Sequence, residues 1–225
     1  MVEKKYMKKK LFLLTLGLLT LSSCKKENTH LPEDNGCIER VIIPVTAHDL
    51  KASDILLVNN LFLNNNIDNR NFRYNYFSEY SAQLSNLSEP KTDIKSVVVD
   101  QYSNGLRILN SSIQYYFYNN IFKSVSNEIS KGTSLNIQPH LKLSELRKLY
   151  IKDVKLRDKD LFNLNDTCIK AEFGYYNINS YYDKSREQLI KAWKVTPKNG
   201  NFPVAYYKDE DGGYLYYWNG LFFQL

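Results

Sequence analysis

The sequence has few of the residues from which catalytic and metal sites are built. It contains three histidines, His30, His48 and His140, and three cysteines among 225 residues. The histidines stand far apart, and no His-Glu-x-x-His, Cys-x-x-Cys or glycine-rich phosphate loop occurs. These absences exclude the zinc-protease, thiol-redox and nucleotide-binding motifs that spacing alone reveals. We expect no catalytic residue, no metal site and no cofactor.

Two short stretches invite a catalytic or metal-binding interpretation, but each has a simpler one. His48 is followed directly by Asp49, yet the pair precedes a predicted helix and no nucleophile can be assigned to it. A surface histidine is therefore the better interpretation. The acidic segment 208–213 (KDEDGG) suggests a calcium loop, but its length and its order of oxygen ligands match none. We interpret this segment as a turn.

The chain lacks an apolar run long enough to span a bilayer comfortably, but it begins with a shorter one. Residues 11–21 (LFLLTLGLLTL) are uncharged and follow a stretch with five lysines, a pattern typical of an export signal. The run ends in Leu21-Ser22-Ser23-Cys24, which resembles the bacterial lipobox. The resemblance implies that residues 1–23 are a lipoprotein signal peptide and that Cys24 carries a diacylglyceryl thioether. The alternative is an ordinary secretory signal followed by an accidental cysteine.

A lipid on Cys24 would anchor the protein in a bacterial cell envelope, at the outer membrane or the cell surface. Two or more acyl chains give stable membrane attachment. Residues 24–36 are polar and contain Pro32 and Gly36, so we expect a flexible tether there. The two remaining cysteines, Cys37 and Cys168, form an even pair in an oxidising compartment, which predicts a disulfide between them.

The chain also lacks a strong charge of one sign once the signal is removed. The full sequence has 30 basic and 24 acidic residues and a net charge of +6. Five lysines and Glu3 belong to the signal, which leaves 25 basic and 23 acidic residues and a net charge of +2. No stripe of Lys and Arg interleaved with aromatic residues occurs, so nucleic-acid binding is not expected.

Helical and strand periodicities alternate along the remaining chain. Apolar spacings of three and four predict a helix over residues 53–63, which the run of asparagines at 64–66 ends, and a second helix after Ser144. Asn104-Gly105 and the Asp211-Gly212-Gly213 segment are typical of hairpin turns. We predict strands over residues 38–45, 72–77, 94–102, 113–118, 121–129, 169–178, 189–196, 203–208 and 214–218.

Each half of the chain therefore consists of one helix followed by an antiparallel meander. The pattern predicts an α+β fold with two subdomains, each a helix packed on an antiparallel sheet. Residues 132–139 form the boundary between the halves. We place the first domain over residues 37–131 and the second over residues 140–225.

The order of elements resembles a known pair of domains. The predicted first helix, the strand NFRYNYF and the hairpin QYSNGLRIL (residues 101–109) are similar to the FTP domain, the fungalysin/thermolysin propeptide domain. Residues 189–217 resemble a PepSY domain, which follows the FTP domain in thermolysin-type prodomains. The resemblance assigns family-motif positions to Gln101, Tyr102, Asn104, Gly105, Trp193, Asp209 and Gly213.

The resemblance implies a protein-binding module that inhibits or chaperones a protease in trans. No His-Glu-x-x-His follows the second unit, so we expect a prodomain-like lipoprotein without a protease domain, and not an enzyme. Its mechanism would be steric, through an edge strand or loop laid against the partner. A hydrolase of another type would show a buried carboxylate pair in a cleft. The other alternative is a glycan-binding or polymer-binding lipoprotein, whose candidate surface is Tyr115, Tyr116, Tyr118, Tyr175, Tyr176, Tyr181 and Tyr182.

Overall fold

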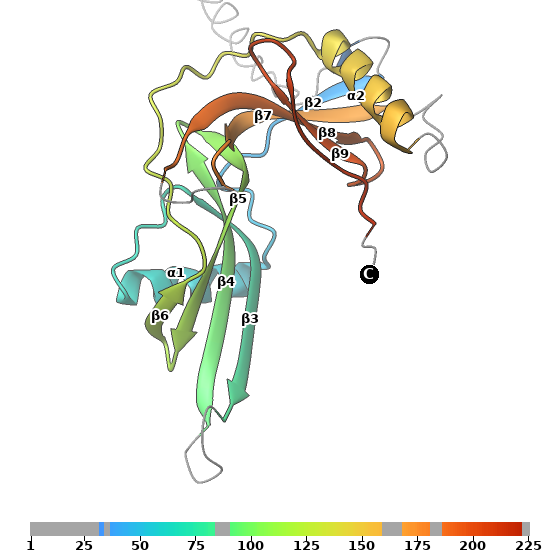
Figure 1. Ribbon diagram of the computed structural model, residues 1–225. Coiled ribbons are helices and arrows are strands. Elements are labelled where there is room, and N and C mark those ends of the chain that lie inside the picture. Colours follow the sequence, from blue (N-terminus) through green and yellow to red (C-terminus); the bar gives the residue numbers. More distant parts are fainter. Residues whose placement is uncertain (1–31, 34–36, 84–90, 159–167, 181–185, 222–225) are drawn as a thin grey trace, which may run out of the picture.

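The computed structural model describes residues 32–33, 37–83, 91–158, 168–180 and 186–221 (Figure 1). The predicted signal peptide, the lipidation site Cys24 and the two tyrosines Tyr181 and Tyr182 lie outside these residues. Most of the predicted tether also lies outside them. Within the tether, however, the short strand β1 (Pro32–Glu33) pairs with β2 (Ile38–Val41). This part of the tether is therefore a strand rather than a flexible link.

Strands dominate the described part of the chain. Ten strands belong to one sheet, in which the main order is β10-β9-β8-β7-β5-β4-β3. In addition to these seven, β2 pairs with β1 and β7, and β6 pairs with β5. The remaining bounds are β3 (Phe72–Ala82), β4 (Thr92–Ser103), β5 (Leu106–Tyr118), β6 (Ile121–Val125), β7 (Ile169–Asn177), β8 (Leu189–Pro197), β9 (Val204–Lys208) and β10 (Tyr214–Trp218), with helices α1 (Ala52–Asn64) and α2 (Leu143–Asp158).

The predicted α+β fold with two helix-on-sheet subdomains is wrong. Of the described residues, 45% lie in strands and 18% in helices, and the strands form one mixed sheet. Two parallel pairings at β7 join the two halves, one with β2 over residues 38–41 and one with β5 at Ile108 and Tyr175. Parallel partners lie far apart in sequence and share no hairpin turn. Local periodicity therefore gave no sign of them.

The hairpin turns follow the sequence prediction. Asn104 and Gly105 both have positive φ angles, of 50° and 76°, between β4 and β5. Asn119 and Asn120 do the same between β5 and β6, with φ angles of 50° and 66°. Asparagine and glycine tolerate this left-handed region, which a tight two-residue hairpin requires. The Asn104-Gly105 turn is therefore confirmed, and the predicted strands over residues 113–118 and 121–129 are joined by a turn of the same kind.

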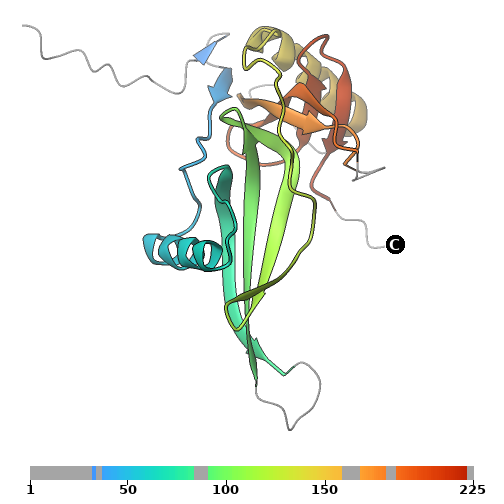
Figure 2. The same cartoon turned by 90° about the vertical axis from the view of Figure 1, so that its left-hand side faces the viewer.

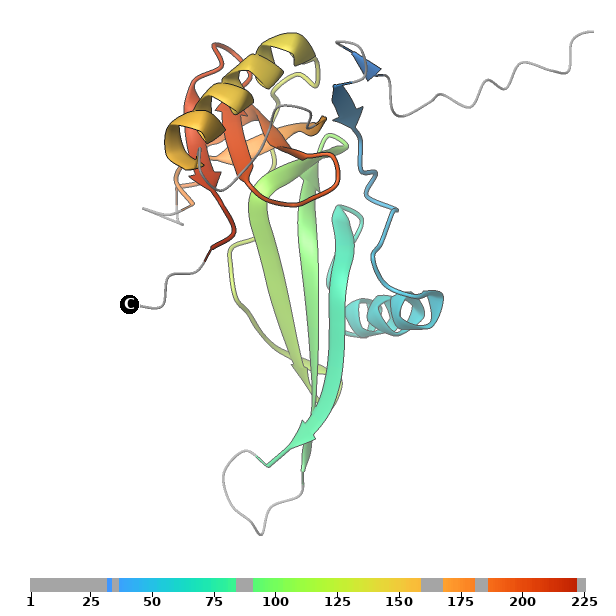
Figure 3. The ribbon, with the colours of Figure 1, turned by 90° about the vertical axis from the view of Figure 1, so that its right-hand side faces the viewer.

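Two helices cover parts of the sheet. Helix α1 packs Val58, Leu61 and Phe62 into an apolar cluster with β3, β4 and β5. Helix α2 packs Leu146 and Tyr150 into a second cluster with β2, β7, β8 and β9. Figures 1 and 2 show β3, β4 and β5 extending as a long ribbon away from the region that α2 covers. Figure 3 shows α1 on one side of this ribbon.

Candidate functional site

Two predicted motif residues, Trp193 and Asp209, contact each other in the interior. The side chain of Asp209 is 0% exposed. It accepts a hydrogen bond from the Trp193 indole nitrogen at 2.8 Å and from the backbone N–H of His140 at 2.9 Å. The N–H of Leu141 also donates to it at 3.2 Å, and the Lys191 ammonium lies 3.1 Å away. Asp209 therefore fastens the segment before α2 to the end of β9.

The hydrogen bonds to Asp209 stabilise its charged form. Burial alone would raise the pKa of this carboxyl group, but the donors from His140, Trp193 and Leu141 lower the pKa below its ordinary value. Gly213, the third motif residue of this half, closes the adjoining turn by accepting a bond from the Lys208 N–H at 2.8 Å. In the structure these motif residues have structural roles.

The motif residues of the first half hold the segment that links the two halves. The Gln101 side chain donates to the Ser111 hydroxyl and accepts from the N–H of Ser130, both at 2.6 Å. Asn104 donates to the carbonyl of Thr133 at 2.6 Å. The Tyr102 hydroxyl donates to the carbonyl of Ile43 at 2.9 Å. Together with Gly105, these residues also line a cavity of about 840 Å³.

A buried charge cluster, which the sequence did not indicate, lies where β5 meets β7. Arg107 contacts the carboxylates of Asp100 at 2.9 Å and Glu172 at 2.5 Å. Arg73 contacts the same oxygen of Asp100 at 3.2 Å. These four side chains are at most 11% exposed. Because each carboxylate is paired with an arginine, the cluster links neighbouring strands of the sheet. It is not the pair of proton-sharing carboxylates that a hydrolase would show.

The predicted tyrosine surface is only partly at the surface. Tyr115, Tyr175 and Tyr176 are buried, so including them in a binding surface was wrong. Strand alternation turns Tyr115 toward α1, where its ring packs against Phe62. Tyr116 and Tyr118 are half-buried. They lie on the opposite face of the ribbon.

Two exposed tyrosines of β3 complete this face. Tyr76 is 56% exposed and Tyr80 is 54% exposed. In the register of the sheet, Tyr80 lies opposite Ile94 and Ile94 lies opposite Tyr118. Residues directly opposite each other share a face, so these tyrosines point away from α1. We call Tyr76, Tyr80, Tyr116 and Tyr118 the tyrosine face.

The outer edge of β3 adjoins the tyrosine face. At its start, the N–H and carbonyl of Tyr74 are bonded by His48 and Asp49. Further along, the Asn119 N–H donates to the Asp93 carbonyl, so Asp93 directs its backbone groups toward β5. By alternation, its neighbour Ser81 directs its own groups outward.

The same alternation applies to Phe77 and Glu79, which with Ser81 form the open edge. No described strand pairs with the outer side of β3. In Figure 3 β4 lies on one side of the lower half of this strand and no ribbon lies on its outer side. A long edge without a partner is a template for another strand. The open edge therefore offers three N–H groups and three carbonyls.

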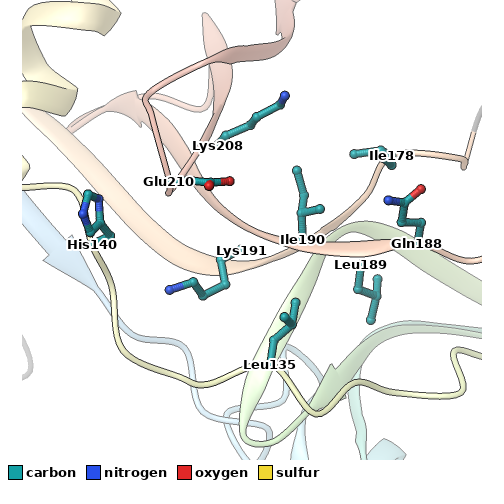
Figure 4. Close-up of a pocket in the computed structure, with 9 residues that line it drawn as sticks. All are labelled: Leu135, His140, Ile178, Gln188, Leu189, Ile190, Lys191, Lys208 and Glu210. Atoms are coloured by element: carbon teal, nitrogen blue, oxygen red, sulfur yellow. The ribbon is translucent and has the colours of Figure 1, made fainter.

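A second candidate is a cavity of about 510 Å³ beside β8, shown in Figure 4. Leu135, Ile178, Leu189 and Ile190 supply its apolar lining. His140, Gln188, Lys191, Lys208 and Glu210 supply its polar lining. The cavity adjoins the end of β8 that extends beyond its pairing with β9.

The two cysteines of the predicted disulfide lie next to each other where β2 and β7 begin. Cys37 and Cys168 immediately precede the paired residues Ile38 and Ile169, and the N–H of Ile169 donates to the Cys37 carbonyl at 2.9 Å. Both thiols are free. Partial burial raises the pKa of the Cys168 thiol, and the neighbouring Cys37 thiol raises it further. The disulfide itself stays a prediction, but the two residues are adjacent.

Comparison with known protein families gives no match for this chain, and comparison with curated proteins gives none either. The resemblance to propeptide domains therefore stays a prediction that rests on the residues quoted for it. The described residues contain no cluster of three metal-ligating side chains. Neither helix in the described part of the chain has the length and apolar composition to cross a bilayer.

Proposed function

We propose that the chain is a non-catalytic lipoprotein of the bacterial cell envelope that binds a partner protein along the open edge of β3. The observation that carries the proposal is the outward direction of the backbone groups of Phe77, Glu79 and Ser81. An extended segment of a partner pairs with such an edge through main-chain hydrogen bonds. The tyrosine face then supplies contact area beside the added strand.

The composition of the edge favours binding by another strand. Natural proteins protect long edges with lysine, proline or inward-pointing charges. Along residues 75–82 the only charged side chain is Glu79, and its carboxylate lies 2.9 Å from the Lys95 ammonium. The edge is thus long, nearly uncharged and flanked by exposed Tyr76 and Tyr80. A partner strand would meet little electrostatic repulsion there.

The proposed partner is a protease or another secreted enzyme of the envelope, as the resemblance to prodomains implies. Such a partner would be inhibited sterically, because a strand laid across its cleft blocks the entry of substrate. The lipid on Cys24 would hold the module at the membrane. The segment between Cys24 and β1 would set its distance from the bilayer.

A matched pair of variants at Glu79 tests the proposal. Glu79→Pro removes one outward N–H and places a ring where the partner strand would lie, whereas Glu79→Ala keeps the N–H and removes only the ion pair. Losing one main-chain hydrogen bond costs about 1 kcal/mol, and the ring adds a steric clash. We therefore expect affinity to fall at least tenfold for the proline variant and to stay within about threefold for the alanine variant.

The experiment uses the purified full chain on resin with native envelope extract. Partners retained by the wild type and Glu79→Ala but lost by Glu79→Pro support the proposal. Equal retention by both variants refutes binding at this edge. Circular dichroism and thermal unfolding of each variant check that the sheet is intact.

Binding of a glycan or another polymer is the second candidate function. It is favoured by the exposure of Tyr76 and Tyr80, because rings of this kind stack on sugars. A stacked sugar uses the rings and not the backbone edge. Tyr76→Ala with Tyr80→Ala would then abolish binding of peptidoglycan or oligosaccharide fractions, and Glu79→Pro would leave that binding unchanged.

A further inference from the structure

We propose that the cavity beside β8 is a second peptide site, which binds an extended polypeptide segment by pairing with the backbone of Leu189. The site is separate from the open edge of β3 and does not rest on the function proposed for that edge. Its occupant would lie in line with β9, beyond the point where β9 ends.

On one side Leu189 is paired with Asn177 of β7, but on the side away from β7 its backbone has no strand beside it among the described residues. The pairing of β8 with β9 runs from Ala192 to Val195. One further bond, from the Asp209 N–H to the Lys191 carbonyl at 3.0 Å, extends it. Because alternate residues direct their backbone groups to the same side, Leu189 presents its N–H and carbonyl on the side from which Asp209 reaches Lys191.

The opposite side of β8 confirms this direction. The N–H of Ile178 donates to the carbonyl of Gln188 at 3.1 Å, and Ile190 pairs with Tyr176 of β7. Gln188 and Ile190 therefore direct their backbone groups toward β7, and Leu189 directs its groups into the cavity.

The side chains around the cavity fit an added strand better than a compact ligand. In Figure 4, Ile190 points to one side of β8 and Leu189 to the other. Ile178 lies on the side of Ile190, and Leu135 lies on the side of Leu189. The cavity thus surrounds the edge of the sheet instead of covering one face. A strand that pairs with this edge presents successive side chains to opposite faces, so two consecutive apolar residues would each meet an apolar contact.

The charges at the rim allow one more inference about the peptide. The Lys191 ammonium is already engaged by Asp209 at 3.1 Å and by the Gln138 carbonyl at 2.9 Å. Lys208 and Glu210 make no ion pair with another described residue. These two opposite charges lie at the β9 end of the cavity. A peptide that carries two polar or oppositely charged residues next to its apolar residues could therefore contact both of them.

A phage library of linear heptapeptides, selected on the purified full chain, supplies the probe. Selected peptides are synthesised with a fluorophore, and their Kd is measured by anisotropy for the wild type, Leu189→Pro and Leu189→Val. Proline removes the N–H that faces the cavity and is tolerated at an edge position. Valine keeps that N–H with a similar side chain. We expect a Kd at least tenfold higher for Leu189→Pro, within threefold of wild type for Leu189→Val, and unchanged for Glu79→Pro.

Hydrogen exchange gives a second measurement that needs no variant. The Leu189 amide is expected to exchange quickly in the free chain and at least tenfold more slowly with a selected peptide bound. The proposal is overturned if no selected peptide protects this amide, or if Leu189→Pro binds as well as wild type. Self-association that Leu189→Pro abolishes would assign the site to a second copy of the chain and would also overturn it.

Discussion

Replacing Asp209 with asparagine is expected to lower the free energy of unfolding by about 3 to 5 kcal/mol, the cost of breaking a buried, hydrogen-bonded ion pair. The carboxylate is fully buried and accepts from two backbone N–H groups and an indole. Lys191 is its cationic partner. Asparagine has nearly the same volume, so the substitution leaves no cavity. It replaces one acceptor oxygen by an NH₂ group that faces other donors.

Urea unfolding followed by circular dichroism measures this loss. For a chain of this size, 1 kcal/mol corresponds to about 2 to 4 °C in Tm, so the variant should melt about 6 to 20 °C below wild type. Glu210→Gln, one residue along the turn, is the matched control and should change stability by less than about 0.5 kcal/mol. A loss below 1 kcal/mol for Asp209→Asn would refute the role assigned to this carboxylate.

The Asp209 carboxylate should also make the free energy of unfolding depend on pH in the acidic range. Because the hydrogen bonds lower the pKa of Asp209 in the folded state, its contribution is present above the unfolded pKa of about 3.9 and is lost as pH falls through the lower folded pKa. The stability difference between wild type and Asp209→Asn should therefore shrink below about pH 4. A difference that stays constant down to pH 2 would contradict this assignment.

Three further outcomes are expected. Burial and the nearby Arg73 lower the pKa of His48, whose neutral Nδ1 accepts the Tyr74 N–H at 3.0 Å. The stability that His48 contributes is therefore complete above the unfolded pKa of about 6.5 and falls as the pH is lowered from there toward the folded pKa. His48→Gln should remove this dependence, so that its Tm changes less than that of wild type between pH 7 and pH 5. Oxidation of Cys37 and Cys168 closes a loop of about 130 residues and should stabilise the chain by up to about 5 kcal/mol. Thiol counting and urea unfolding with and without reductant measure this, and unchanged stability would count against the bridge. A Cβ at Gly174 would lie 2.4 Å from the Arg107 carbonyl oxygen, so Gly174→Ala should cost about 2 kcal/mol or more by thermal unfolding, unlike Gly200→Ala, whose Cβ meets nothing closer than 3.6 Å.

Local patterns predicted the elements well. Apolar spacing placed both helices, and Asn104-Gly105 placed the central hairpin, because periodicity and turn chemistry depend on neighbouring residues. The asparagines at 64–66 do end α1, where the Asn65 side chain donates to the Leu61 carbonyl at 2.8 Å. Strand β10 has the predicted bounds of residues 214–218.

Long-range pairings escaped prediction. The bridge between Ile108 and Tyr175 depends on a glycine at position 174, which lets β5 approach β7 closely. No sequence pattern near Gly174 indicates which strand lies beside it. The charge cluster of Arg73, Asp100, Arg107 and Glu172 was missed for the same reason, because its members come from four strands.

The candidate site was half predicted. Tyrosine density pointed to residues 115–118, but the density did not show that Tyr115 faces the core while Tyr116 faces outward. Tyr76 and Tyr80 were missed as surface residues: Tyr76 lies in the predicted strand over residues 72–77, but Tyr80 lies in the part of β3 beyond the predicted end. The burial of a strand side chain depends on which face of the sheet a helix covers, and this is set by the tertiary structure. The open edge of β3 could be recognised only from the full order of strands in the sheet.

Binding at the open edge of β3 is tested by amide hydrogen exchange at Phe77, Glu79 and Ser81 with and without the captured partner. We expect these three amides to exchange quickly in the free chain and at least tenfold more slowly in the complex. The amides of Ser78 and Tyr80 face β4, so they should be protected in both states. A complex in which the three outward amides still exchange at their free rates would contradict binding at the β3 edge.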